Sequence, residues 1–209
     1  MSGKEKKLTP RSARKKKAML EAAWQVLARE GYERASLDMV LSLCGGSKAT
    51  IYNYFKSKED LFGKAVFARS YELSRRVFQD FSDQEDFITE LYIFGLRYLN
   101  FYLNTDLLEI SRVAMAEGKN LDYGRVLYEE GFRKNWATVA VYLEKHIEPE
   151  KFLTGGSWTA AMHLKGLLDR EMLIRRAWGV MDGIDDKDLR DVVQSGITAF
   201  ARIYGIEQE

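Results

Sequence analysis

The stretch Ser36–Phe62 reads SLDMVLSLCGGSKATIYNYFKSKEDLF and decides the fold predicted for the first part of the chain. Its opening serine can cap a helix, and the apolar residues that follow recur at helical spacing and predict one buried face. These residues are Leu37, Val40, Leu41 and Leu43. Gly45 and Gly46 then supply the backbone freedom that a tight reversal requires, so a second helix can follow at once.

The second helix follows Ser47, which can cap it. Ile51 and Phe55 are four residues apart and share one face, which we expect to pack inward. The other sides carry a cation, a hydroxyl, a phenol and an amide: Lys48, Thr50, Tyr52 and Asn53. Such groups bind phosphates and base edges in the major groove of DNA, so the stretch predicts a helix-turn-helix whose second helix enters the groove.

Three further polar residues are candidates for contacts with the DNA backbone. We expect Ser47 and Lys58 to bind phosphates, and Ser36 to touch a phosphate in addition to capping its helix. The segment Ser57–Asp60 has the pattern of a capping box, which predicts that a longer helix begins there.

The string SKATIYNYFKSKEDLF, residues 47–62, resembles the recognition helix and following linker of the TetR family of bacterial transcriptional regulators. Order, spacing and residue type agree over the whole string, and with the preceding helices the resemblance covers residues 11–65. The family usually has Ala-Gly-Val at the turn, where this chain has Cys44-Gly45-Gly46. The resemblance implies a homodimeric, ligand-responsive repressor.

Composition agrees with a globular, mainly helical protein. The chain has 209 residues, of which 46% are apolar, and only two are prolines, which favours long helices. It contains no run of about eighteen apolar residues and no apolar stretch behind its basic N-terminus, so we expect neither a membrane span nor a secretory signal. A single cysteine excludes an internal disulfide, and the sequence predicts a cytoplasmic protein.

Charge is distributed unevenly along the chain. The first 64 residues carry 14 Lys and Arg against 7 Asp and Glu, whereas the remaining residues carry 18 against 24. A basic N-terminal part joined to an acidic remainder is typical of a head that binds a polyanion and a body that does not. We expect residues 1–10, which include Lys4, Lys6 and Lys7, to be disordered, either as a solvated tail or as an arm on the DNA.

The pattern predicts an all-α fold of nine helices with no strand. A helix over 11–30, ended by Gly31, joins the two short helices in a DNA-binding domain of residues 11–56. The other helices cover 57–80, 87–103, Thr105 through Met115, 120–146, 157–178 and a last one closed by Gly205. Residues 57–209 are thereby predicted to form a helical bundle for ligand sensing and dimerisation.

Two functions are predicted for this bundle. The last two long helices carry apolar residues beyond one face, which favours a two-fold interface over the core of a monomer. Six large side chains are candidates for lining an apolar ligand pocket, although ordinary core packing explains each one taken singly: Tyr92, Tyr98, Phe101, Met115, Trp136 and Tyr142. Arg97, His163 and Lys165 are expected to orient an anionic or polar group of the ligand, to lie on the surface or to form internal hydrogen bonds.

No pattern of catalytic or metal-ligating residues emerges. His146 and His163 have no partner at zinc-ligand spacing, and we find no nucleophile with a base, so we expect no metal, cofactor or enzymatic activity. Two competing interpretations are a helical enzyme or small-molecule binding protein, and a peripheral membrane protein that uses Lys4–Lys17 on anionic lipid. We favour a sequence-specific DNA-binding repressor, which a small apolar ligand releases from a palindromic operator.

Overall fold

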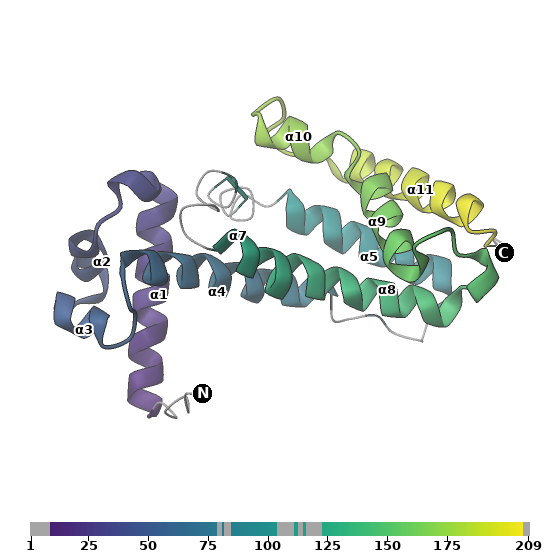
Figure 1. Cartoon of the computed structure of the whole chain (residues 1–209). Helices are drawn as coiled ribbons and strands as arrows, with labels where there is room; N and C mark the ends of the chain where they lie inside the picture. The colour runs from purple at the N-terminus through teal and green to yellow at the C-terminus, as the bar shows by residue number, and fades with distance from the viewer. Residues whose placement is uncertain are drawn as a thin grey trace. The chain divides into compact units, whose positions relative to one another are not determined.

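The computed structural model describes residues 9–78, 81, 85–103, 111–112, 115 and 123–206. Its regular elements within these ranges are all helical, which confirms the all-α class (Figure 1). Residues 1–8 of the predicted arm and most of the helix predicted from Thr105 to Met115 lie outside the described residues. In the described part, no helix is both long enough and apolar enough to cross a membrane.

The chain divides into two compact units. Unit 1 comprises residues 1–69 and 113–124, and unit 2 comprises residues 70–112 and 125–209. Helix α4, Lys58–Phe78, begins in unit 1 and ends in unit 2 without an interruption of its helical backbone. One helix therefore contributes side chains to both cores.

Unit 1 contains α1 (Pro10–Arg34), α2 (Leu37–Cys44), α3 (Lys48–Tyr52) and the first turns of α4. Helix α1 begins one residue earlier than predicted, because Thr9 caps it by accepting a hydrogen bond from the Ser12 N–H. Gly31 has the expected positive φ of 72°, but the helix resumes after this kink and ends at Arg34. The apolar face of α1, with Met19, Ala23 and Val26, is buried in the unit, so it is not available to a membrane surface.

The short helices differ from the prediction in two details. Leu43 is 48% exposed and does not belong to the buried face of α2, because six residues after Leu37 the helix has turned it toward solvent. Helix α3 has only five residues and ends at Tyr52, before the expected end. Ile51 and Phe55 are nevertheless both buried, as predicted.

The start of α4 confirms the predicted cap. Ser57 Oγ accepts a hydrogen bond from the Asp60 N–H, and the Asp60 carboxylate accepts one from the Lys56 N–H at 2.9 Å. Burial raises the pKa of Asp60, but the hydrogen bonds from Lys64 and the Lys56 N–H outweigh it and leave this pKa below its ordinary value. Leu61 and Phe62 follow as buried residues of unit 1.

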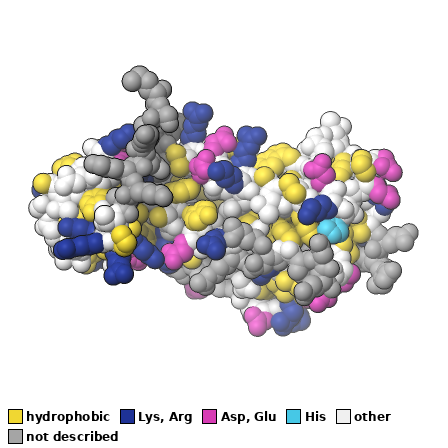
Figure 2. Space-filling model, turned by 90° about the horizontal axis from the view of Figure 1, so that it is seen from below, with side chains coloured by type: hydrophobic (Ala, Val, Ile, Leu, Met, Phe, Trp, Pro, Cys, Tyr) yellow, Lys and Arg dark blue, Asp and Glu magenta, His cyan; other side chains and the backbone are white. Residues whose placement is uncertain are grey.

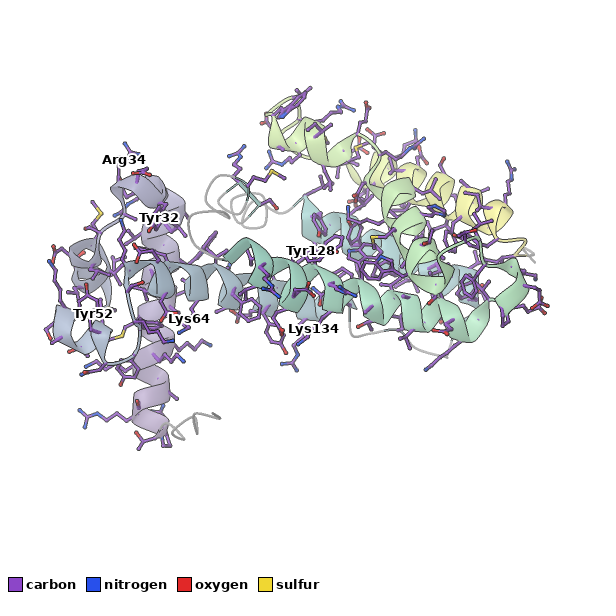
Figure 3. All side chains as sticks on the ribbon, in the orientation of Figure 1. Tyr32, Arg34, Tyr52, Lys64, Tyr128 and Lys134 are labelled. Atoms are coloured by element: carbon purple, nitrogen blue, oxygen red, sulfur yellow. The ribbon has the colours of Figure 1, made fainter. Side chains whose placement is uncertain are left out.

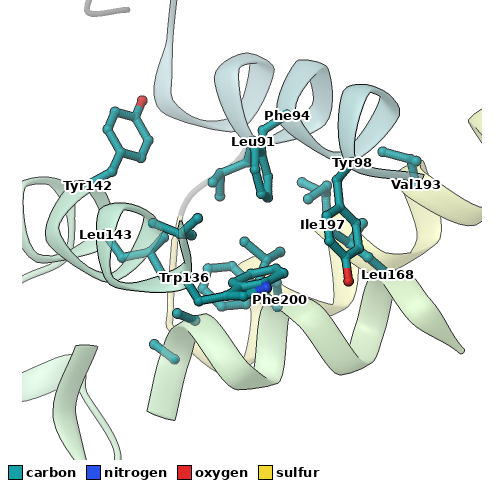
Figure 4. Packing of buried hydrophobic residues seen from close by; sticks show 14 of the residues in the cluster. Leu91, Phe94, Tyr98, Trp136, Tyr142, Leu143, Leu168, Val193, Ile197 and Phe200 are labelled. Carbon is teal, nitrogen blue, oxygen red and sulfur yellow. The ribbon is translucent and has the colours of Figure 1, made fainter. Parts of the chain in front are cut away.

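Unit 2 is a bundle built mainly from α5 (Phe87–Tyr102), α8 (Lys134–His146), α9 (Gly156–Asp169) and α11 (Asp186–Ile203). Helix α8 is preceded by α7 (Tyr123–Val126) and by a π-helical segment (Leu127–Arg133), and it is followed by a 3₁₀ turn (Pro149–Lys151). The helices form one aromatic-rich core (Figure 4). Val77 and Phe78 of α4 belong to the same core.

The helix predicted over 157–178 is wrong as a single element. It is broken between α9 and α10 (Met172–Ala177) by Arg170, whose φ of 43° is outside the right-handed helical region. The residue before the break, Asp169, is held from two sides: Tyr98 Oη donates to it at 2.7 Å, and Lys165 forms an ion pair with it. The helix ends here although the sequence has no Gly or Pro next to Asp169 that would indicate an end.

Candidate nucleic-acid interface and effector site

Serine caps and a glycine pair shape the helix-turn-helix motif. Ser36 accepts a hydrogen bond from the Met39 N–H at 3.3 Å, and Ser47 accepts one from the Thr50 N–H at 3.2 Å. Gly45 and Gly46 have φ values of 70° and 103°, which residues with a side chain rarely adopt. The turn between α2 and α3 therefore has the predicted form.

The predicted DNA-contacting residues of α3 lie on its open side. Tyr52 is 53% exposed (Figure 3), Lys48 and Asn53 are exposed, and Thr50 is half-buried beneath the cap of Ser47. The hydroxyls of Ser47 and Thr50 share a hydrogen bond of 3.0 Å. A short helix thus presents a phenol, an amide, hydroxyls and an ammonium together. These groups can form hydrogen bonds with phosphates and with base edges.

An ion pair at this surface was not expected from the sequence. Lys48 Nζ lies 2.8 Å from Asp38 Oδ2 of α2, and the hydrogen bond to Asp38 raises the pKa of Lys48. The two residues are ten positions apart and meet only because the turn folds α3 back toward α2. The sequence gives one indication of this pair, because Asp38 and Lys48 are the only acidic and the only basic residue between Ser36 and Phe55.

Lys58 is placed differently from the residues of α3. Its half-buried side chain puts Nζ 3.4 Å from the Tyr32 carbonyl oxygen and 4.7 Å from the centroid of the Tyr32 ring. The Tyr32 hydroxyl in turn donates to Glu59 at 3.0 Å. Sequence reasoning missed these contacts, which join the end of α1 to the start of α4.

A second polar contact links α1 to the end of the motif. Ser12 Oγ donates to the Tyr54 hydroxyl at 2.9 Å, over 42 residues of sequence. The first turns of α1 also carry exposed cations, and Figure 2 shows Lys and Arg side chains over the end of the molecule that carries α1 to α3. The exposed cations of α1 near its start are Arg11, Arg14, Lys15 and Lys17.

Five of the six predicted ligand-lining residues belong to the core of unit 2. Tyr98, Trp136 and Tyr142 are buried, and Tyr92 and Phe101 are half-buried against the same cluster. Met115 is the exception, because its side chain is 86% exposed and does not pack in this core. A helical pattern by itself does not show whether an apolar side chain is buried.

Trp136 lies at the centre of this aromatic cluster (Figure 4). Its ring centroid is 5.1 Å from that of Tyr98, 5.6 Å from that of Phe78 and 5.9 Å from that of Phe94. The indole Nε1–H is fully buried, and within the described part of the chain it has no hydrogen-bond acceptor. A buried donor without an acceptor is costly, so this N–H is available to a polar atom of a bound molecule.

A short polar network borders the cluster. Burial raises the pKa of Tyr98 well above its ordinary value, with Tyr102 and Asp169 adding to the effect, and the pKa of Tyr102 rises to about 12 for the same main reason. Both phenols are therefore neutral. Lys165 forms an ion pair with Asp169, which agrees with the internal hydrogen bond that was one of the three alternatives for this residue.

A surface hollow of about 510 Å³ lies elsewhere on unit 2 and contains none of the six predicted ligand residues. It is lined by Leu153, Met162, His163, Gly166, Leu167 and Ile203, which come mainly from α9 and α11. His163 Nδ1 is 2.8 Å from the Tyr204 hydroxyl. This apolar depression lies on the helices predicted to form the dimer.

A helix-turn-helix unit with an exposed reading helix, together with a separate helical bundle, defines the class of helix-turn-helix regulators. A model of the tetR family of bacterial regulatory proteins matches residues 19–65, and one described as the C-terminal domain of AefR-like transcriptional repressors matches residues 89–206. The chain belongs to the TetR family, whose members are DNA-binding transcriptional regulators and not enzymes.

Two curated relatives match a minor part of the chain. The DNA-binding transcriptional repressor TetR of Mycobacteroides abscessus is 36% identical over 74 residues, which are 35% of this chain and 39% of that protein. The regulator YhgD of Bacillus subtilis is 44% identical over 48 residues, which are 23% of this chain and 25% of that protein. The chain thus matches less than half the length of these curated relatives.

Solved structures match over nearly the whole chain. A TetR-family transcriptional regulator of Mesorhizobium loti is 25% identical, with a TM-score of 0.83 over 93% of this chain and 98% of that one. The flavonoid-responsive regulator FrrA is 24% identical, with a TM-score of 0.77 over 91% of this chain and 96% of that one. FrrA therefore shares the fold.

Proposed function

We propose that this protein is a cytoplasmic, sequence-specific DNA-binding repressor, which occupies a palindromic operator as a homodimer and is released by a small, largely apolar effector. The observation that carries the proposal is the exposed side of α3, where Tyr52, Asn53 and Lys48 stand clear of the core. Family membership supports it, because the family is one of DNA-binding regulators.

In the proposed complex, α3 enters the major groove and the serine hydroxyls at the caps, Ser36 and Ser47, approach the backbone. Lys58 also binds a phosphate, since an ammonium has three donors and the Tyr32 carbonyl engages only one of them. The exposed cations at the start of α1 add contacts that do not depend on sequence.

Selection of binding sites from a random DNA pool, followed by footprinting, tests this function. We expect a palindromic site whose half-sites are separated by about one helical turn or a multiple of it, and an affinity that falls steeply as salt rises. Purified protein that enriches no sequence and binds no duplex in dilute buffer would contradict the proposal.

Asn53→Ala is expected to reduce affinity for the selected operator by about 10-fold or more, while affinity for random DNA stays nearly constant. The reason is that an exposed amide can pair with a base edge, whereas random DNA is held mainly through its phosphates. Fluorescence anisotropy with both duplexes measures the two affinities. Asn100→Ala, at an exposed position of α5, is the matched control. Equal losses on both duplexes would remove Asn53 from base readout.

The proposed dimer uses the outer faces of α9 and α11. Gly166 supports this choice, because glycine inside a helix costs about 1 kcal/mol relative to alanine. A Cβ at this position would meet no atom within 4 Å, so packing inside the unit does not require glycine here. Gly166 lines the apolar hollow together with Met162, Leu167 and Ile203, where a helix of a second copy could approach closely.

The proposed effector site is the aromatic cluster around Trp136. Its unpaired Nε1–H would recognise a hydrogen-bond acceptor on an otherwise apolar molecule, and the neighbouring rings would supply the apolar contacts. Phe78 of α4 packs 5.6 Å from Trp136, while Leu61 and Phe62 of the same helix are buried in unit 1. An effector that displaces Phe78 would therefore bias α4 and shift the population of DNA-binding heads.

Trp136→Phe is expected to keep the fold but lower effector affinity about 10-fold, because it removes one hydrogen-bond donor and retains an aromatic ring. A panel of small aromatic compounds with and without a carbonyl acceptor is screened by thermal unfolding. At 100 times its dissociation constant, a true effector should raise the Tm of the wild type by about 5–10 °C.

Trp158→Phe serves as the control, since Trp158 is a half-buried tryptophan packed against the same core. Compounds found in the screen are then added to the protein–operator complex, where they should lower the affinity for the operator. If the effective compounds bind Trp136→Phe as tightly as the wild type, or leave operator affinity unchanged, this effector site is wrong.

A further inference from the structure

One ion pair joins the two helices of the helix-turn-helix motif. Between Ser36 and Phe55, Asp38 is the only acidic residue and Lys48 the only basic one. Their charged atoms are 2.8 Å apart, across the turn made by Gly45 and Gly46. While this pair is closed, the Lys48 ammonium is engaged with a carboxylate and not with solvent alone.

The pair lies in water and is not part of the core. The side chains of Lys48 and Asp38 are 55% and 72% exposed. An ion pair this exposed adds little stability, because water solvates both ends and ordering two long side chains costs entropy. The motif is held instead by buried apolar residues such as Val40, Ile51 and Phe55. The fold thus has little need of the pair, which lies beside the exposed residues of α3.

We propose that Asp38 is a specificity-determining residue, which withholds Lys48 from the phosphates of random DNA and holds its ammonium in place on the operator. This inference rests on the proposed function. Random DNA binds chiefly through counterion release. A lysine already paired with a carboxylate releases no counterion, and that carboxylate repels the backbone.

Asp38 has a smaller effect on affinity for the operator than on affinity for random DNA. Contacts made by Thr50, Tyr52 and Asn53 fix α3 in the groove, so binding no longer depends on one additional phosphate contact. The closed pair then keeps the Lys48 side chain in one orientation at the first position of α3. Asp38 therefore weakens binding to random DNA more than binding to the operator, and it raises the ratio of the two affinities.

Asp38→Asn is expected to raise affinity for a random-sequence duplex about 2- to 5-fold at low salt. The slope of log affinity against log salt concentration should steepen by about 0.9, which corresponds to one added phosphate contact. Affinity for the selected operator should change by less than about 2-fold. Anisotropy titrations of fluorescein-labelled duplexes at several salt concentrations measure all three quantities.

Glu33→Gln is the matched control, because it removes one exposed acid from α1 of the same unit and leaves the partner of Lys48 intact. In a Lys48→Ala background, the effect of Asp38→Asn should shrink to that of Glu33→Gln, which isolates the coupling between the two residues. Equal gains on operator and random DNA, or an effect no larger than that of Glu33→Gln in the wild type, would overturn the inference. A wild type that binds neither duplex contradicts the proposed function instead.

Discussion

Gly166→Arg is expected to convert the proposed dimer into a monomer whose unit 2 stays folded, with a Tm that falls only by the stabilisation that the lost interface contributed. The monomer tolerates the change because a side chain at this position meets nothing within 4 Å, and arginine is a better helix former than glycine. A partner helix packed into the hollow would instead meet a charged side chain among Met162, Leu167 and Ile203. An unpaired charge buried in an interface is strongly unfavourable.

The loss should extend to DNA binding. Two linked heads on a palindrome gain about 10²- to 10⁴-fold over one head, because the second binding event is intramolecular. We therefore expect operator affinity to fall by about this factor, while affinity of a single head for a half-site is preserved. Sedimentation velocity gives the oligomeric state, thermal unfolding followed by circular dichroism gives the stability, and anisotropy gives the affinity.

A second helical glycine provides the control for Gly166→Arg. Gly131, in the π-helical segment, also has open space within 4 Å of the place that a Cβ would take, and it lies outside α9 and α11. Gly131→Arg adds the same charge and should leave the protein dimeric. A Gly166→Arg protein that sediments as a dimer of wild-type affinity would show that this face is not the interface.

Gly196→Val is expected to destabilise unit 2 by about 3 kcal/mol and to lower its Tm by about 6–12 °C. Gly196 is buried on α11 against α9, where a Cβ would lie 2.9 Å from the Leu167 carbonyl oxygen and 3.3 Å from its carbon. These are backbone atoms of a neighbouring helix, so the clash cannot be relieved by a side-chain rotation. The two helices would have to move apart and lose contacts along the core.

Ser195→Val is the matched control for Gly196→Val, because it places the same β-branched side chain on an exposed position of the same helix. Its Tm should stay within about 2 °C of the wild type. Differential scanning calorimetry on both variants compares the transitions. If Gly196→Val melts at the wild-type temperature, α9 and α11 do not approach as closely as described.

The two glycines differ in a way that the sequence does not express. Gly166 and Gly196 both interrupt helical patterns with no side chain, and propensity assigns them the same cost. Only packing separates them, since one faces open space and the other faces backbone. Packing likewise decides that the side chains of Met115 and Leu43 are exposed, although both residues belong to apolar helical patterns.

The sequence by itself determined the local elements of the reading head. Ser36, Ser47 and the glycine pair specify caps and a turn through bonds within four residues, so their placement is readable without tertiary information. The exposure of the α3 side chains could also be predicted from local sequence. Two apolar residues of this short segment pack inward, which leaves its other sides exposed. The helical class also follows from periodicity alone.

Tertiary structure decided the contacts between residues far apart in the chain. The pairing of Lys48 with Asp38, the contact of Lys58 with Tyr32 and the hydrogen bond from Tyr98 to Asp169 all require separate segments to be brought together. Such contacts depend on where two side chains lie after the chain has reversed direction. No periodic pattern in the sequence indicates these positions. The Trp136 N–H, which has no acceptor among the described residues, is a further example, since only the packed core determines whether a buried donor finds an acceptor.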